Sequence, residues 1–151
     1  MKNIFQSDIA AEVIRRIEKL KPEDKPLWGK MSADQMLAHC NVSYNMTWHP
    51  EKFKKSGAVK KFFLKLLVKK FVTSESPYRK NGGTSPEFIQ TGQYDFEEEK
   101  AELIGHVQKA QQLGSAWFEG RDNISFGKMT SREWNNLFYK HLDHHLTQFG
   151  I

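Results

Sequence analysis

Apolar residues recur along the chain at intervals of three and four, which is the spacing of one face of an α-helix. The first such stretch covers residues 8–20, where the apolar side chains are Ile9, Val13, Ile14 and Ile17. Further stretches with this spacing cover residues 33–48, 59–72, 96–113 and 130–151. No segment shows the sustained alternation of apolar and polar residues that predicts a strand. The pattern therefore predicts an all-α protein of four or five helices.

Capping residues mark several of the expected helix ends. Ser32 is followed three residues later by Gln35, and Thr130 by Glu133, and each pair has the form of a capping box. Gly150 stands where the last helix would stop. Two other expected helices begin after a single capping residue. This residue is Ser7 or Asp8 for the first helix and Asp95 for the helix at 96–113.

The longest irregular stretch is residues 73–91, which contains Asn81-Gly82-Gly83 and two prolines. A loop of this length is often functional or mobile. Its residues Tyr78, Arg79 and Lys80 are candidates for lining the mouth of a site, and a plain surface connection is the simpler alternative. Two shorter connections are expected at residues 21–30 and 117–128.

Length and composition describe one ordinary globular domain. The chain has 151 residues, of which 27% are charged and 38% hydrophobic, so we expect a single domain over residues 1–151 with a real core. Its one cysteine, Cys40, cannot form an intrachain disulfide. The first residues lack the apolar run of a signal peptide, and no stretch approaches the roughly 20 apolar residues of a membrane span. We therefore expect a cytoplasmic protein.

Basic charge is concentrated in residues 51–80, which hold ten Lys or Arg and two Glu. The helix expected at 59–72 has two distinct faces. Its basic face consists of Lys61, Lys65 and Lys69, and its apolar face consists of Phe63, Leu67 and Phe71. Such a helix can lie on an anionic membrane or in the groove of a partner. We favour a helix packed on the others with a lysine-rich solvent side, so membrane contact is not expected. No nucleic-acid recognition motif accompanies the lysines, and nucleic acid is not an expected partner.

Candidate chemistry lies in the last predicted helix, which contains His141, His144 and His145. His141 and His145 are four residues apart and therefore stack on one helix face, the usual way for a helix to offer two imidazoles to one metal ion. His141 and His144 also lie close enough to pair. A solvated histidine face near the helix C-terminus is the alternative without a metal. Leu142 stands where helical zinc proteases have a glutamate, so this is not a protease motif.

A third ligand is needed because two imidazoles alone make a weak site, and the candidates are His39, His49 and His106. His39 lies on a mostly apolar face of the helix at 33–48 and should point into the core. A buried histidine there is either a hydrogen-bonded core residue or a ligand, and the pair on the last helix favours the ligand. His49 falls at a helix end, and His106 is expected to face solvent. Cys40 is rotated about 100° from His39 and should point elsewhere.

A site of His39, His141 and His145 suits a divalent ion such as zinc or nickel. Three protein ligands leave a position open for water or substrate. Gln148 lies three residues beyond His145 on the same side of the helix, where it is a candidate for an outer contact to the site or a contact to substrate. A plain surface role is the alternative.

Two motifs resemble a known family. These are MSADQMLAHC in the second helix and FGKMTSREWNNLFYKHLDHHLTQFG at the end of the chain. They are similar to the DinB-like superfamily, and most closely to its branch of small bacterial proteins known only as a domain of unknown function. The resemblance implies a four-helix bundle with a long crossover connection, often dimeric. It implies a metal triad at His39, His141 and His145, commonly holding zinc or nickel.

Some members of that superfamily are thiol transferases that use bacillithiol or mycothiol. The resemblance therefore suggests a metal-dependent transferase acting on a low-molecular-weight thiol, or a hydrolase, in a homodimer. The alternative is a non-catalytic binding or structural protein, in which a metal staples two helices or is absent.

Overall fold

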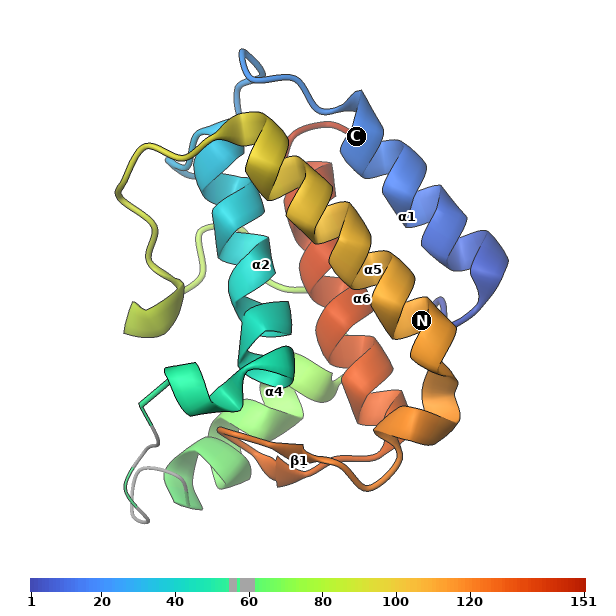
Figure 1. Ribbon diagram of the computed structural model, residues 1–151. Helices are drawn as coiled ribbons and strands as arrows, with labels where there is room; N and C mark the ends of the chain where they lie inside the picture. The colour runs from blue at the N-terminus through green and yellow to red at the C-terminus, as the bar shows by residue number, and fades with distance from the viewer. Residues whose placement is uncertain (55–56, 58–61) are drawn as a thin grey trace.

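The computed structural model describes residues 1–54, 57 and 62–151, and these are mostly helical (Figure 1). The long helices are α1 (Ser7–Lys19), α2 (Ala33–Trp48), α5 (Phe96–Phe118) and α6 (Ser131–Gln148). The shorter ones are the 3-10 turns η1 (Pro50–Lys52) and η3 (Pro86–Phe88), the π-helix η2 (Leu64–Val68) and α4 (Lys69–Thr73). A short antiparallel hairpin joins α5 to α6 and consists of β1 (Asp122–Asn123) and β2 (Gly127–Lys128). The expectation of an all-α protein is confirmed in that the described chain is mostly helical.

The predicted capping boxes are present at the N-termini of α2 and α6. The amide oxygen of Gln35 accepts the backbone N–H of Ser32 at 3.2 Å, and a carboxylate oxygen of Glu133 accepts that of Thr130 at 2.9 Å. Both helices begin at the residue after their cap, as predicted. The predicted cap of α1 is wrong, because Gln6 is the capping residue and Ser7 already lies within the helix.

Helix α5 is longer than predicted and contains a kink. It continues to Phe118 through Gly114, which has φ +71° and ψ 168°. This conformation is almost confined to glycine, because a β-carbon would clash with the backbone. The connection predicted at 117–128 therefore starts two residues later, and its middle forms the β1–β2 hairpin, which the apolar pattern did not predict.

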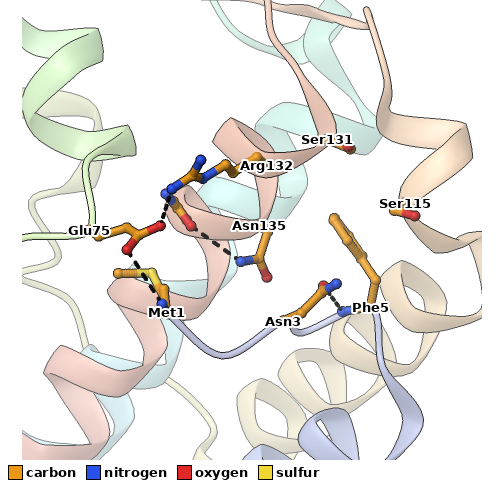
Figure 2. Close-up of a pocket in the computed structure, with 9 residues that line it drawn as sticks. Met1, Asn3, Phe5, Glu75, Ser115, Ser131, Arg132 and Asn135 are labelled. Carbon is orange, nitrogen blue, oxygen red and sulfur yellow. Dashed lines mark hydrogen bonds and ion pairs between the residues drawn. The ribbon is translucent and has the colours of Figure 1, made fainter.

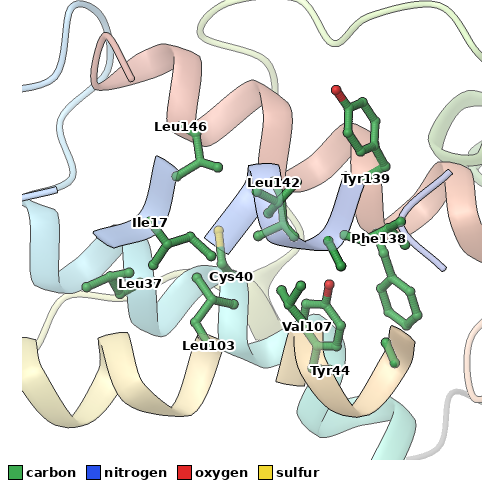
Figure 3. Packing of buried hydrophobic residues seen from close by; sticks show 14 of the residues in the cluster. Ile17, Leu37, Cys40, Tyr44, Leu103, Val107, Phe138, Tyr139, Leu142 and Leu146 are labelled. Carbon is green, nitrogen blue, oxygen red and sulfur yellow. The ribbon is translucent and has the colours of Figure 1, made fainter. Parts of the chain in front are cut away.

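The four long helices lie side by side around one apolar core (Figure 1). Side chains from all four meet there, and Figure 3 shows their packing around Cys40, Tyr44 and Leu142. Helix α2 contacts both α5 and α6, and α5 and α6 also contact each other. This arrangement brings the middle of α2 against the second half of α6, where the candidate histidines lie.

The helix expected at residues 59–72 differs most from its prediction. Residues 59–61, with Lys61, and the side chain of Lys65 lie outside the described part of the chain. The rest forms η2 and α4 across one end of the molecule, against α6. Phe63, Leu67 and Phe71 are 54%, 65% and 53% exposed, so their face does not pack on the other helices as expected.

The described helices include none that is both long enough and apolar enough to cross a membrane.

Candidate metal centre

The histidine pair on α6 has the geometry that its spacing predicts. The ring centroids of His141 and His145 are 4.8 Å apart, with the ring planes at 85°. Residues four apart on a helix are neighbours on one face, so both imidazoles leave α6 in the same direction. His145 is buried, whereas His141 is partly exposed.

The third imidazole comes from α2. The Nε2 atom of His39 lies 2.9 Å from Nε2 of His141, and the His39 ring centroid lies 4.5 Å from that of His145. One ligand nitrogen from each residue can be chosen so that all lie within 4.8 Å of one another. The structure thus brings together the three histidines that the sequence singled out.

Two of the imidazoles have a fixed tautomer. Nδ1 of His39 lies 2.8 Å from the backbone oxygen of Phe88, and Nδ1 of His145 lies 2.8 Å from the side-chain oxygen of Gln148. Because both oxygens can only accept, each Nδ1 must carry the proton and donate it. The Nε2 atoms of His39 and His145 then keep their lone pairs, as a metal ligand requires.

Gln148 is itself held in one orientation. Its amide nitrogen donates to the backbone oxygen of Trp28 at 2.6 Å, which leaves its oxygen for His145. Gly29, with φ +84°, allows this close approach, since a β-carbon there would lie 2.5 Å from the Gln148 amide nitrogen. The sequence predicted Gln148 as an outer contact, and the structure places it against the histidine farthest along α6.

All three histidines favour the neutral form. Burial lowers the pKa of His39 and of His141 below the usual range, and it lowers the pKa of His145 to about 3. Each protonated ring would also repel its neighbours in the cluster. Neutral imidazole is the form that binds a metal, so the site is electrostatically prepared for a cation.

The donor set fits a divalent ion of the zinc or nickel class. Zinc binds imidazole nitrogen at about 2.0–2.1 Å, so two such ligands of a tetrahedral ion stand about 3.3 Å apart. The separations in this cluster, from 2.9 Å up to 4.8 Å, bracket that value. Small rotations of the rings would satisfy it, and Nδ1 of His39 and Nδ1 of His145 are each bonded to an oxygen outside the cluster.

A family profile described as "Protein of unknown function (DUF1569)" matches residues 4–150. The chain belongs to the DUF1569 family. This confirms the expected membership of a domain family of unknown function. No curated protein and no solved structure matches the chain.

The loop predicted to line a site covers the histidines of this DUF1569 protein. The ring of Phe88 in η3 lies edge-on to His39 at 5.5 Å and to His141 at 5.9 Å between centroids. Tyr78 meets the ring of His144 at 5.6 Å, and Lys80 lies 4.3 Å above the ring of Trp28. Of the predicted trio, Tyr78 and Lys80 therefore stand next to the site.

His144 flanks the cluster without belonging to it. Its ring lies 5.0 Å from that of His145 and 5.7 Å from that of Trp28. Among the described residues, the group close enough to hold one ion consists of His39, His141 and His145. The sequence left open whether His141 pairs with His144 or with His145. In the structure His39 joins the pair of His141 and His145.

The other candidates of this DUF1569 chain have structural roles. His49 is exposed beside Glu51, 3.5 Å away. His106 does not face solvent as expected, because its Nδ1 accepts the indole N–H of Trp48 at 3.0 Å and its ring stacks on Tyr44. Cys40 is fully buried in the core, where burial raises the pKa of its thiol, and it is not part of the cluster.

Two cavities of the described structure lie beside the triad or away from it. One of about 310 Å³ is lined by Glu75, Arg132 and Asn135, near the first turns of α6 (Figure 2). Another of about 460 Å³ includes Trp28 and His144 in its wall and so reaches the flank of the histidine cluster. Neither cavity has a triad histidine in its wall.

Two parts of the site gave no signal in the sequence. They are the backbone oxygens of Phe88 and Trp28, which orient His39 and Gln148. Any residue type can supply a backbone oxygen, so composition and spacing do not reveal it. The η3 turn over 86–88, which begins at a proline, was the available hint that the loop has a defined conformation there.

Proposed function

We propose that this DUF1569 protein is a metal-dependent enzyme that holds a divalent ion, zinc or nickel, between His39, His141 and His145. The observation that carries the proposal is that three imidazoles gather with their ligand nitrogens within 4.8 Å of one another. His39 and His145 each donate Nδ1–H to an oxygen, which leaves the Nε2 lone pair of both rings for an ion.

The residues of the site have two different roles, which are to bind the ion and to orient a ligand. His39, His141 and His145 supply three neutral ligands, and Gln148 holds the ring of His145. A divalent ion in such a site supplies a Lewis acid that favours the thiolate form of a bound thiol or the hydroxide form of a bound water. His141 is the partly exposed member of the triad, which puts the open side of the site next to it. The Phe88 ring beside it limits access of water from the loop side.

The reaction that we favour is transfer of a low-molecular-weight thiol, with hydrolysis as the second reaction of the same site. The resemblance to the DinB-like superfamily supports the choice. The HxxxH spacing of His141 and His145, and four long helices with a long connection at residues 49–95 between α2 and α5, agree with its four-helix bundle and crossover. On the same ground we propose a homodimer in a bacterial cytoplasm, where the single buried Cys40 stays reduced.

A non-catalytic role is the competing candidate, and one distance favours it. With 2.9 Å between the Nε2 atoms, His141 can donate a hydrogen bond to His39 and satisfy both rings with no ion. The site would then join α2 to α6 as a structural contact, with or without a metal.

Metal analysis of the purified, untagged protein tests the site itself. The expected result is near one equivalent of zinc or nickel per chain, and none in the variant His39→Ala, His141→Ala, His145→Ala. His49→Ala is the matched control, because His49 is exposed and outside the cluster. Failure of the parent to bind any divalent ion after add-back would overturn the proposal.

Cobalt substitution separates the enzyme from the structural protein. An open site binds an added thiol and gains the absorption of a sulfur–cobalt bond, and a closed site does not change. Thiol-transfer or hydrolytic activity should depend on the ion and disappear in His145→Ala, while the helix content measured by circular dichroism stays the same. Activity that survives complete metal removal would end the enzyme proposal.

A further inference from the structure

The segment from residue 62 to 73 has two apolar faces, and the core covers one of them. Leu64 and Val72 are partly buried against the core. The exposed apolar side chains, which we name the outer apolar face, are Phe62, Phe63, Leu66 and Leu67. These side chains are between 54% and 65% exposed. Contiguous exposed apolar surface of this kind marks a contact with a membrane or another molecule.

Polar contacts to α6 fix the orientation of this segment. Its outer apolar face therefore stays exposed and does not turn toward the core. Lys69 forms an ion pair with Glu133 of α6 at 2.9 Å. Lys140 of α6 donates to the backbone oxygen of Phe71 at 2.7 Å, and Asn136 donates to that of Thr73 at 2.8 Å. These polar contacts hold the segment against α6, which lies beside it in Figure 1, and the apolar side chains of the outer face stay exposed.

Charge indicates the kind of partner. Residues 52–74 contain eight lysines and no acidic residue. Lys70 is exposed next to Phe71 in this segment. Two copies of the segment paired on each other would bring only like charges together, which disfavours self-association through this face. An anionic lipid surface offers apolar depth for the rings and negative charge for the lysines.

We propose that the outer apolar face docks on an anionic lipid bilayer, with the helix lying in the plane of the interface. This differs from the expectation drawn from the sequence, because that expectation assigned the apolar side to the core. The exposed Lys70 meets the lipid headgroups, and Phe62, Phe63, Leu66 and Leu67 enter the boundary of the acyl chains.

Co-sedimentation with vesicles tests the proposal on the full chain. The parent should bind vesicles of phosphatidylcholine and phosphatidylglycerol, and bind them less as salt rises, and it should not bind pure phosphatidylcholine. The variant Phe63→Ser, Leu67→Ser should lower binding by about tenfold or more, because two exposed anchors are removed. Leu27→Ser is the matched control, since Leu27 is 70% exposed elsewhere on the surface.

A labelled variant gives a readout that does not depend on removing side chains. Leu67→Cys can carry an environment-sensitive fluorophore, while Cys40 is fully buried and stays unlabelled. Its emission should shift to the blue on addition of anionic vesicles. No binding of the parent at low salt would overturn the proposal. So would a dimer that dissociates on Phe63→Ser, Leu67→Ser, because the face would then be a contact between copies of the chain.

Discussion

At the scale of single residues, the site depends on which nitrogen of each imidazole carries the proton. The backbone oxygen of Phe88 fixes the proton on Nδ1 of His39, and the amide oxygen of Gln148 fixes it on Nδ1 of His145. Both oxygens belong to residues outside the cluster. Residue type and spacing predicted that His141 and His145 lie together, because histidines four apart on a helix share a face. They could not predict the acceptors from the main chain, which depend on how the loops at 21–30 and 73–91 fold over α2 and α6.

Removal of the Gln148 side chain should weaken metal binding without removing a ligand. In Gln148→Ala, His145 loses the acceptor at 2.8 Å that fixes its tautomer. Loss of such a partner typically lowers metal affinity by about 10–100-fold. Competition with a chromophoric chelator measures the change, and Gln108→Ala, on the exposed side of α5, should leave the affinity as in the parent. Equal affinity in both variants would contradict the role of Gln148.

The metal-free protein should lose stability in mild acid. Burial lowers the pKa of His145 from 6.5 to about 3, so below pH 6.5 the unfolded chain takes up protons that the folded chain does not. The free energy of unfolding therefore falls as pH drops from 7.5 to 5.5, by about 1 kcal/mol from His145 alone. His39 and His141 act in the same direction.

Urea unfolding of the metal-free protein at several pH values measures this dependence. The exposed His49→Ala should reproduce the parent, whereas His145→Gln should show a weaker dependence on pH. A parent whose stability is constant from pH 7.5 to 5.5 would contradict the burial of neutral histidines.

At the scale of helices, local signals predicted the boundaries and tertiary contacts decided the rest. The caps at Ser32 and Thr130 act within one turn, and both predicted starts are correct. The end of α5 was predicted too early, because Gly114 kinks the helix without ending it. The periodicity of residues 59–72 predicted an apolar side packed on the other helices. In the structure Leu64 and Val72 pack against the core, Phe63 and Leu67 stay exposed, and polar contacts to α6 add to the packing.

Lys140 shows how α6 holds the end of α4. Its side chain is 3% exposed and donates to the backbone oxygens of Phe71 and Ser74 at 2.7 and 2.8 Å. Lys140→Met leaves these oxygens without their donor, which costs about 1–3 kcal/mol in the free energy of unfolding. Chemical denaturation measures the loss, with exposed Lys25→Met as the control. A loss no larger than that of the control would show that water replaces the lysine.

Two glycines of α5 should respond to alanine in opposite ways. Gly114 has φ +71°, so Gly114→Ala should destabilise the protein by roughly 1–3 kcal/mol. Gly105 lies in the same helix with nothing within 4 Å of an added β-carbon, so Gly105→Ala should stabilise by about 0.5–1 kcal/mol. Thermal unfolding of both variants gives the comparison. A stabilising Gly114→Ala would mean that α5 can straighten at no cost.

At the scale of the whole molecule, the packing of α2 against α6 makes a site from segments that are far apart in the chain. The sequence predicted which helices contribute, because each carries histidine on a face that should be covered. It misjudged His106, which the indole of Trp48 holds in a partly buried position. Such a contact between α2 and α5 follows from the arrangement of helices and not from the local pattern.

The separation of 102 residues between His39 and His141 also has a consequence for biosynthesis. A ribosome adds about 5–20 residues each second, so His39 exists for roughly 5–20 s before His141, the first of its histidine partners, is made. During that interval the nascent chain presents α2 without α6, and the cluster cannot yet form. Any ion must therefore be acquired late, from the pool that the cell offers to nearly finished chains, and its identity reflects that supply as well as the donor atoms.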